Sequence, residues 1–267
     1  IQPVWRADRP QRGRFRQFVQ CDIDVIGEAT NLAETELILA TTTALDKLGF
    51  SDVNVRISDR RLLNALARCA GFSEQQTPAV FIALDKMDKI GVVGVMQELE
   101  AVAPDKAEPF INLICRITAA EDPFALCAEE LGDYLPEDVR KNLEEILYVT
   151  NNCITNGKVS FDVTLVRGMG YYTGTIYEIS VEGLTSSVAG GGRYDKMIGR
   201  ITGTDVPACG FSIGFERIVL LLQERGFVPP AKRGMAVLVD KNMDKKQLLD
   251  VEQACRHLRE RRKVTVL

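Results

Sequence analysis

The chain has 267 residues, of which 46% are hydrophobic and 26% are charged, as in an ordinary globular protein. Its net charge of −4 provides no general attraction for nucleic acid, so any such binding must come from local patches. No apolar run approaches the length of a membrane span and the start does not resemble a signal peptide, so we expect no membrane partner. Because the chain opens with Ile-Gln-Pro-Val and no methionine, we expect an N-terminal portion to precede residue 1.

The cysteine and histidine content limits the chemistry that the chain can perform. Seven cysteines are scattered and never form a C-x-x-C pair, which indicates free thiols in a reducing, cytoplasmic compartment. His257 is the single histidine, so a histidine-based metal centre is excluded and a catalytic triad would have to use this residue. We therefore predict no metal ligands among the side chains.

Two alternating strands are predicted at the start of the chain, over 2–8 and about 14–26, with an arginine-rich turn at 9–13 between them. Side chains alternate across a sheet, so the odd positions of the second strand are expected to form an apolar core face. The even positions are Arg14, Arg16, Phe18, Gln20, Asp22 and Asp24. Arginines at one end of this polar row suit phosphates, and carboxylates at the other end suit an ammonium group. A solvated sheet face would show the same alternation, but this order of charges is less expected of one.

A helix, a strand and a long helical segment follow. Residues 35–48 have the apolar spacing of a helix that ends at Gly49, and residues 53–57 alternate as a third strand. The pattern from about 59 to 149 predicts a helical insertion or a small helical domain. Its breaks fall at Gly71, Gly91, Pro104, Pro123 and Pro136. The charged run Asp85-Lys-Met-Asp-Lys89 within it is expected to be a solvated helix face.

The stretch from 161 to 178 is the one around which we expect the chain to be organised. Two β-rich runs, 161–166 and 172–181, flank a connection with two glycines, which predicts a hairpin with Arg167 at its mouth. Two tyrosines follow at once. A planar cation beside two aromatic hydroxyls suits an anionic ligand that carries an aromatic group, although the stretch by itself also fits a hairpin with a solvated arginine.

Three further segments complete the predicted core. After a short strand at 186–189, Gly190-Gly-Gly-Arg-Tyr-Asp195 is expected to be a loop that lets backbone approach a ligand closely, although such a loop also serves simply as a turn. Residues 207–213 are predicted to be a strand that enters a helix at 214–224. Arg217 lies in the first turn of that helix, where the helix dipole favours anions, so its position fits either a bound anion or a solvated side chain.

The C-terminal residues have the pattern of a separate unit. Residues 229–234 have the composition of a linker. Residues 235–240, a helix at about 244–261 and residues 264–267 form a β-α-β pattern, which is the start of a parallel α/β domain.

Two short motifs indicate other classes of enzyme. Gly210-Phe-Ser-Ile-Gly214 fits the nucleophile elbow of a hydrolase, but His257, its only available base, lies in the separate C-terminal unit. The glycines at 168–174 miss the dinucleotide-binding spacing by one residue and lead into a strand, which disfavours a Rossmann loop.

Four segments in order match the pattern of one enzyme family. They are Trp5-Arg6-Ala7-Asp8 with Phe15-Arg16-Gln17-Phe18 (motif 2), Leu165-Val-Arg-Gly-Met-Gly-Tyr-Tyr-Thr-Gly174 and Ala189-Gly-Gly-Gly-Arg-Tyr-Asp195 (two histidine signatures) and Gly210-Phe-Ser-Ile-Gly-Phe-Glu-Arg217 (motif 3). Together they resemble the histidyl-tRNA synthetases, which are class II aminoacyl-tRNA synthetases. The resemblance spans essentially the whole chain, and four ordered motifs are far more specific than any one of them.

The resemblance implies an α+β fold, in which an antiparallel sheet is flanked by helices. The catalytic core would comprise 1–58 and 151–226, with the helical insertion at 59–150 between them. A linker at 227–234 would lead to the start of an anticodon-binding α/β domain at 235–267. Motif 1, which is expected to build a homodimer interface, and a loop of the imidazole pocket would precede residue 1.

The resemblance also implies roles for single residues. ATP would be held by Arg6 at the α-phosphate, by Arg14 and Arg217 at the outer phosphates, by Asp8 and by Phe18 stacked on adenine. Histidine would be held by Gln20 and Asp24 at the ammonium, by Arg167 at the carboxylate, and by Tyr171 and Tyr172 along the imidazole. Arg167 and Arg6 would be the catalytic pair. Asp8 stands where relatives usually carry Glu, and Gly170 where many carry Asp.

The implied reaction is the ATP-dependent, Mg²⁺-assisted activation of L-histidine, followed by transfer to tRNA(His). The alternative is a binding module, because the regulatory subunit of ATP phosphoribosyltransferase resembles the same catalytic domain. That relative tends to lose the signature arginine and the C-terminal domain. The presence of Arg167 and of the β-α-β segment favours the enzyme.

Overall fold

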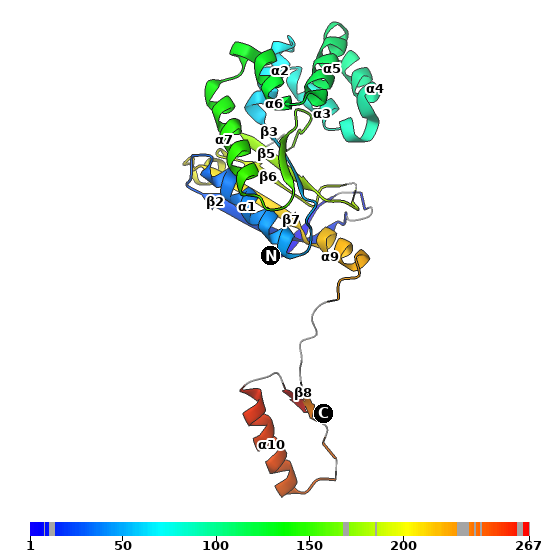
Figure 1. Ribbon diagram of the computed structural model, residues 1–267, viewed down its shortest axis with the longest axis vertical. Helices are drawn as coiled ribbons and strands as arrows, with labels where there is room; N and C mark the ends of the chain where they lie inside the picture. The colour runs from blue at the N-terminus through cyan, green and yellow to red at the C-terminus, as the bar shows by residue number, and fades with distance from the viewer. Residues whose placement is uncertain are drawn as a thin grey trace. The chain divides into compact units, whose positions relative to one another are not determined.

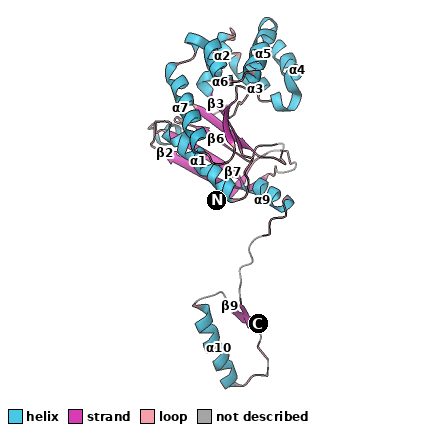
Figure 2. Ribbon diagram, in the orientation of Figure 1, coloured by secondary structure: helices cyan, strands magenta, loops and turns pink. Residues whose placement is uncertain are grey.

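The computed structural model describes residues 1–7, 9–10, 14–167, 171–184, 186–228, 235–237, 239–240, 242–260 and 264–266. The chain divides into two compact units, Ile1–Leu221 and Leu222–Leu267. The first unit combines a mostly antiparallel sheet with flanking helices, which confirms the predicted α+β fold (Figures 1 and 2).

Among the described residues, the first unit contains a seven-stranded sheet in the order β1-β2-β7-β6-β5-β3-β4. The strands are β1 (Gln2–Trp5), β2 (Gln17–Ile26), β3 (Asn54–Asp59), β4 (Lys158–Phe161), β5 (Thr175–Ser180), β6 (Ala189–Arg193) and β7 (Ala208–Gly214). Neighbouring strands are antiparallel except for the parallel pair β3 and β4. Parallel neighbours need a long crossover, and the helical segment between β3 and β4 supplies it.

The helices of the first unit lie either in one long run between β3 and β4 or outside that run. They are α1 (Leu32–Lys47), α2 (Arg60–Cys69), α3 (Thr77–Leu84), α4 (Met87–Glu100), α5 (Pro104–Ala119), α6 (Pro123–Leu131), α7 (Glu137–Cys153), α8 (Met197–Thr202) and α9 (Phe215–Glu224). Helices α2 to α7 form the crossover, which we call the helical insertion (residues 60–153), and Figure 1 shows α2 to α6 gathered at one end of the sheet. Local signals explain several boundaries: Asp59 caps α2, and α5 and α6 begin at prolines, which suit a first helical turn.

The hairpin predicted for 161–181 is wrong. Strand β4 ends at Phe161, and β3 lies between β4 and β5 in the sheet. Val163 and Val166, which the pattern assigned to a strand, are buried in an irregular segment. Burial alone therefore accounts for their apolar character, and a short apolar run does not distinguish a strand from a buried loop.

The glycine-rich loop predicted at 190–195 is also wrong, because most of it is strand β6 inside the sheet. The short strand predicted at 186–189 is correspondingly displaced towards the C-terminus. Strand β7 and helix α9, in contrast, lie where the sequence predicts them.

The odd positions of β2 are less buried than expected for a core face. Ile23 has 43% of its surface exposed, and Trp5 on the neighbouring β1 has 68% exposed. Helix α1 packs mainly on β7, and α7 packs on β3 and β4. The described helices therefore leave the outer part of this face, on β1 and β2, partly uncovered.

The second unit contains a parallel pair of strands, β8 (Met235–Val237) and β9 (Val264–Val266), joined through helix α10 (Lys245–Arg259). This confirms the predicted β-α-β pattern. Asp244 and Gln247 form a capping box at the start of α10, and Cys255 is buried on one face of the helix. The predicted linker at 229–234 lies outside the described residues.

Candidate functional site

The polar face of the sheet forms one continuous row across five strands. The antiparallel registers place Arg56 opposite Glu178, Glu178 opposite Gly190, Gly190 opposite Ser212, and Ser212 opposite Asp22. Directly opposed residues share one face of a sheet. The row from β3 to β2 therefore has charged side chains at its two ends and a floor of small residues, Gly190 and Ser212, between them. Side chains from outside the sheet have room above that floor.

Two glycines of this floor make room for functional side chains. A Cβ atom at Gly190 would stand 2.8 Å from Nη1 of Arg167, and one at Gly210 would stand 1.9 Å from Oδ1 of Asp24. The glycine-rich strands therefore accommodate side chains of the site.

Arg167 is held firmly over this floor. Its Nε donates to Oε2 of Glu178 at 2.6 Å, and its Nη2 donates to Oγ of Ser187 at 2.6 Å. Burial disfavours both charges, but the ion pair outweighs burial: it raises the pKa of Arg167 and holds the pKa of Glu178 below its usual range. Arg167 therefore stays charged and oriented.

A cavity opens beside Arg167, and most of the predicted site residues line it. They are Arg6, Arg14, Phe18, Gln20, Arg167, Tyr171, Tyr172 and Arg217. These residues come from segments far apart in the sequence, and the fold brings them together. The arrangement supports the expectation that Arg6 and Arg217 face one cavity that Phe18 also lines.

The cavity is strongly electropositive. Burial lowers the pKa of the Arg217 guanidinium, and repulsion from Arg14 and Arg167 lowers it further. Arg217 also donates from Nη1 to the carbonyl oxygen of Ser187, next to the segment that holds Arg167. Like charges that crowd together in this way are stabilised by an anion between them.

Arg6 and Phe18 form a stacked pair at the cavity wall. The guanidinium carbon of Arg6 lies 5.0 Å from the ring centroid of Phe18, and Nη2 of Arg6 donates to Oε1 of Gln20 at 3.2 Å. Gln20 in turn donates to Oγ of Ser212. This side of the cavity therefore combines a planar apolar surface with polar groups of fixed orientation.

Asp24 does not line this cavity but lies in the adjoining part of the polar face. Its Oδ1 accepts a hydrogen bond from the hydroxyl of Tyr194, the residue that follows β6. Burial and this hydrogen bond raise the pKa of Tyr194, so its hydroxyl stays neutral. Sequence reasoning missed Tyr194, although it lies within the quoted Ala189–Asp195 signature.

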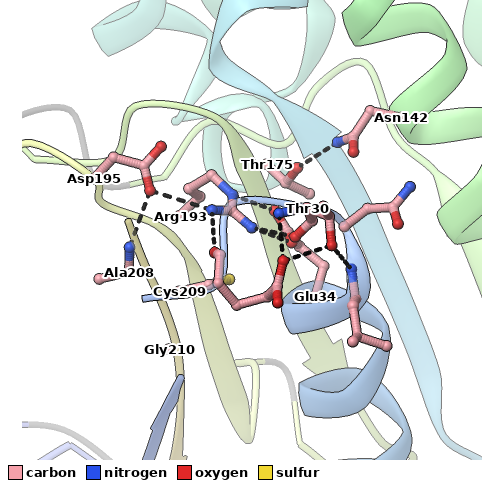
Figure 3. A network of polar contacts seen from close by, with 12 residues as sticks. Thr30, Glu34, Asn142, Thr175, Arg193, Asp195, Ala208, Cys209 and Gly210 are labelled. Carbon is pink, nitrogen blue, oxygen red and sulfur yellow. Dashed lines mark hydrogen bonds and ion pairs between the residues drawn. The ribbon is translucent and has the colours of Figure 1, made fainter. Parts of the chain in front are cut away.

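Arg193, in the same signature, holds elements of the fold together (Figure 3). Its Nη2 and Nε donate to the two carboxylate oxygens of the fully buried Glu34 at 2.6 and 2.7 Å. Its Nη1 lies 3.2 Å from Asp195, which also accepts from the backbone N–H of Ala208. Arg193 thus ties α1 to β6 and β7 beneath the site.

The hydrolase motif has no support in the structure. Ser212 lies within strand β7 and not on a strand-to-helix turn, and its hydroxyl accepts from Gln20. Nδ1 of His257, on α10, lies 3.7 Å from Oε2 of Glu260 on the neighbouring turn.

Two positions noted in the sequence, Asp8 and Gly170, lie outside the residues that the structure describes. Within the described ranges, no three His, Cys, Asp or Glu side chains gather as a metal-ion site. No helix in those ranges is long and apolar enough to cross a bilayer.

Comparison with known proteins decides the family. The family model described as histidyl-tRNA synthetase matches residues 1–218. The chain belongs to the histidyl-tRNA synthetase family. A histidine–tRNA ligase from Leifsonia xyli subsp. xyli is 51% identical over 229 residues, which cover 84% of this chain and 53% of the relative. A histidine–tRNA ligase from Christiangramia forsetii is 37% identical over 97% of this chain and 58% of the relative.

Solved structures agree with this membership of the histidyl-tRNA synthetase family. A histidyl-tRNA synthetase from Nostoc sp. PCC 7120 superposes with a TM-score of 0.81 at 25% identity, over 100% of this chain and 63% of that one. A Bacillus halodurans protein described as an ATP phosphoribosyltransferase regulatory subunit/histidyl-tRNA synthetase has the same fold, with a TM-score of 0.77 at 21% identity. The chain thus spans between half and two thirds of the length of these relatives.

Proposed function

We propose that the protein activates L-histidine with ATP and transfers it to tRNA(His), as a histidine–tRNA ligase. The observation that carries this proposal is the convergence of Arg6, Arg14, Arg167 and Arg217 on one cavity. Guanidinium groups bind phosphate oxygens in a fork geometry, so four of them suit a polyphosphate. Membership of the histidyl-tRNA synthetase family supports the same substrates.

ATP would occupy the wall formed by Arg6 and Phe18. Adenine stacks on the Phe18 ring, Arg6 binds the α-phosphate, and Arg14 and Arg217 bind the outer phosphates. The lowered pKa of Arg217, caused by burial and then by neighbouring arginines, supports an anion at this place. Asp8 is proposed as a further ATP contact from the family resemblance alone.

L-Histidine would lie between the cavity and Asp24. Gln20 and Asp24 accept hydrogen bonds from its ammonium group, and Tyr194 holds the Asp24 carboxylate in place. Tyr171 and Tyr172 line the imidazole, with their ring centroids 4.2 Å apart. Burial raises the pKa of Tyr172, so this hydroxyl stays a neutral donor and acceptor.

The chemical step needs positioned cations and no protein nucleophile. A carboxylate oxygen of histidine attacks the α-phosphorus, a new O–P bond forms, and the bond to the pyrophosphate oxygen breaks. Negative charge builds on the phosphoryl oxygens, where Arg167 and Arg6 offset it. Because Glu178 and Ser187 already hold Arg167, little reorganisation accompanies the step.

Glu216, which the sequence did not indicate as a metal ligand, fits the Mg²⁺ ion that usually accompanies ATP in this family. It lines the cavity, and its Oε1 accepts from the backbone N–H of Val19 at 2.6 Å. Its Oε2 is buried without a hydrogen-bond partner among the described residues. Mg²⁺ prefers such hard oxygen ligands, and the bound ion would neutralise part of the phosphate charge.

Two macromolecular partners are proposed. The uncovered face of β1 and β2, with Trp5 68% and Ile23 43% exposed, supports a homodimer. The tRNA is proposed to engage the β-α-β unit as the start of an anticodon-binding domain. Light scattering on the full-length protein measures the dimer directly.

Histidine-dependent exchange between ATP and pyrophosphate tests the proposed reaction. The full-length protein should catalyse this exchange with L-histidine, and much less with other amino acids. Binding of histidine without any exchange would instead support the regulatory relative. Absence of both would contradict the assignment of the site.

A further inference from the structure

Arg56 of β3 connects the helical insertion to the segment that carries Arg167. Its Nη1 donates to Oδ2 of Asp88 at 3.1 Å, and Asp88 lies in the first turn of α4 inside the insertion. Its Nε donates to Oδ2 of Asp162, and its Nη2 donates to Oγ1 of Thr164 at 3.3 Å. One guanidinium thus contacts both the helical insertion and the segment that follows β4.

The segment from Asp162 onwards leads directly to Arg167 and has little freedom. Oδ1 of Asp162 accepts from the backbone N–H and the hydroxyl of Thr164, at 2.8 and 2.7 Å. Val163 and Val166 are buried against the core. A displacement of the Asp162 carboxylate would therefore be transmitted along the segment to Arg167.

Arg56 also faces the carboxylate that orients Arg167. It lies directly opposite Glu178 on the antiparallel neighbour β5. The pKa of Glu178 is low because Arg167 and, more weakly, Arg56 offset the effect of burial. Glu178 thus lies between Arg56 and Arg167. A shift of Arg56 therefore changes the electrostatic field at Arg167.

The turn between α3 and α4 reaches the same place. Asp85 of this turn interacts electrostatically with Arg167 and Glu178, and burial raises its pKa. The run 85–89 is therefore not only a solvated helix face, because Asp88 is paired with Arg56 of the sheet. Asp88 itself has 72% of its side chain exposed, whereas Arg56 and Asp162 each have 20% exposed.

We infer that Arg56 is a positioning residue for Arg167, and that Asp88 couples the helical insertion to it. The inference rests on the proposed catalytic role of Arg167. Displacements of about 1 Å at a catalytic group can lower a rate by two orders of magnitude, so a modest ionic link can affect the rate measurably. The ion pair of Arg56 with the exposed Asp88 is expected to be weaker than its ion pair with the shielded Asp162.

Three variants of the full-length protein test the coupling: Arg56→Lys, Asp88→Asn and the double variant. Arg56→Lys keeps the charge but loses the fork, so kcat of pyrophosphate exchange should fall about tenfold. Asp88→Asn should lower kcat about three- to fivefold, in line with an exposed ion pair. KM for ATP and for histidine should change less than twofold. In the double variant, the Asp88 change should add almost nothing, because both changes break one link.

Glu98→Gln is the matched control. Glu98 pairs with Lys86 at 2.7 Å inside the insertion, and its side chain is 38% exposed against 72% for Asp88. Among the described residues, both carboxylate oxygens of Glu98 accept from Lys86 and not from the sheet. This variant should keep the kcat of the unaltered protein, and thermal unfolding should show that Asp88→Asn remains folded.

Additive effects of the two changes, or an unaltered kcat in Asp88→Asn, would overturn the coupling. An equal loss in Glu98→Gln would show a general effect on the insertion and would also overturn it. Lack of exchange in the unaltered protein would contradict the proposed function instead. If Arg56→Lys fails to fold, Asp88→Asn against Glu98→Gln still decides the question.

Discussion

The guanidinium of Arg167 lies over Gly190, where a Cβ atom would stand 2.8 Å from Nη1. The absent side chain at position 190 is therefore as much a part of the site as the arginine. Gly190 has no positive φ, so its backbone conformation would accept alanine. Space for Arg167, and not backbone freedom, is what this glycine supplies.

Gly190→Ala is expected to separate activity from stability. The added methyl group pushes on the guanidinium of Arg167, so the free energy of unfolding should fall by no more than the value of its pair with Glu178, about 1–2 kcal/mol. The guanidinium should move off its position, and the activation rate should fall about ten- to a hundredfold. Pyrophosphate exchange and thermal unfolding of one preparation measure both. A normal rate would show that Arg167 need not lie where it does.

Arg167→Ala and Ser212→Ala distinguish the synthetase from a hydrolase. Loss of a cation that acts on the transition state should reduce activation by about two to three orders of magnitude, with much smaller changes in substrate binding. Ser212→Ala removes one hydrogen bond from Gln20 and should leave activation within about threefold. Single-turnover formation of the adenylate measures both. The reverse result would make Ser212 the reactive group.

Asp24 and Tyr194 are expected to act together on histidine affinity. Asp24→Asn removes a charge-assisted hydrogen bond of about 1.5–3 kcal/mol, so histidine should bind roughly ten- to a hundredfold more weakly. Tyr194→Phe removes the hydroxyl that donates to Asp24, and about fivefold weaker binding is expected. Calorimetry with histidine measures these changes, with ATP affinity as the control. Unaltered histidine affinity in Asp24→Asn would move the ammonium site elsewhere.

The ion pair of Glu178 with Arg167 predicts a specific dependence of stability on pH. The pKa of Glu178 is lower in the folded protein than its ordinary value of 4.5. Its contribution is therefore complete above pH 4.5 and is lost as the pH falls through the lowered value. Glu178→Gln should cost about 1–2 kcal/mol at neutral pH, at the low end because 35% of the Arg167 side chain is exposed.

Urea unfolding of the unaltered protein and of Glu178→Gln, between pH 3 and 8, checks this dependence. The difference should be constant above about pH 5 and shrink below it. Glu137→Gln, which disrupts an exposed pair with Arg140 on α7, should show a smaller difference. A difference that grew on acidification would mean that Glu178 is not ionised in the folded protein.

The buried pair of Glu34 and Arg193 is expected to support the fold beneath the site. Glu34 is fully buried and Arg193 has 8% of its side chain exposed, so Glu34→Gln leaves a buried cation with only its longer pair to the partly exposed Asp195. Such a change typically costs about 3–5 kcal/mol. Chemical denaturation measures it, and Glu144→Gln, in an exposed pair with Arg140, should leave the midpoint nearly unaltered. A small cost for Glu34→Gln would show that the network is dispensable.

The sequence by itself determined the local features of the fold and the residue types of the site. Alternation along residues 17–26 placed Gln20 and Asp24 on one face of a strand, because successive side chains point to opposite faces whatever the strand packs against. The helical period from about 59 to 149 and the β-α-β pattern after residue 234 were equally visible. These are properties of a few neighbouring residues.

Only the tertiary structure decided which segments meet. Strand β3 lies between β4 and β5, so the apolar run before Arg167 became a buried irregular segment and not one arm of a hairpin. Strand pairing depends on contacts over a hundred residues, which no local period encodes. The same reason explains why the uncovered face of β1 and β2 was expected to be core.

The tertiary structure also assigned side chains of similar chemistry to different tasks. Arg193 and Arg167 both follow or end β-rich runs in the sequence, yet Arg193 is buried against Glu34 whereas Arg167 lines the cavity. The sequence predicted Asp88 to be one of several solvated charges, whereas in the fold it pairs with Arg56 of β3. A charge has the same intrinsic chemistry everywhere along a chain, but its burial and its partner exist only once distant segments are packed together.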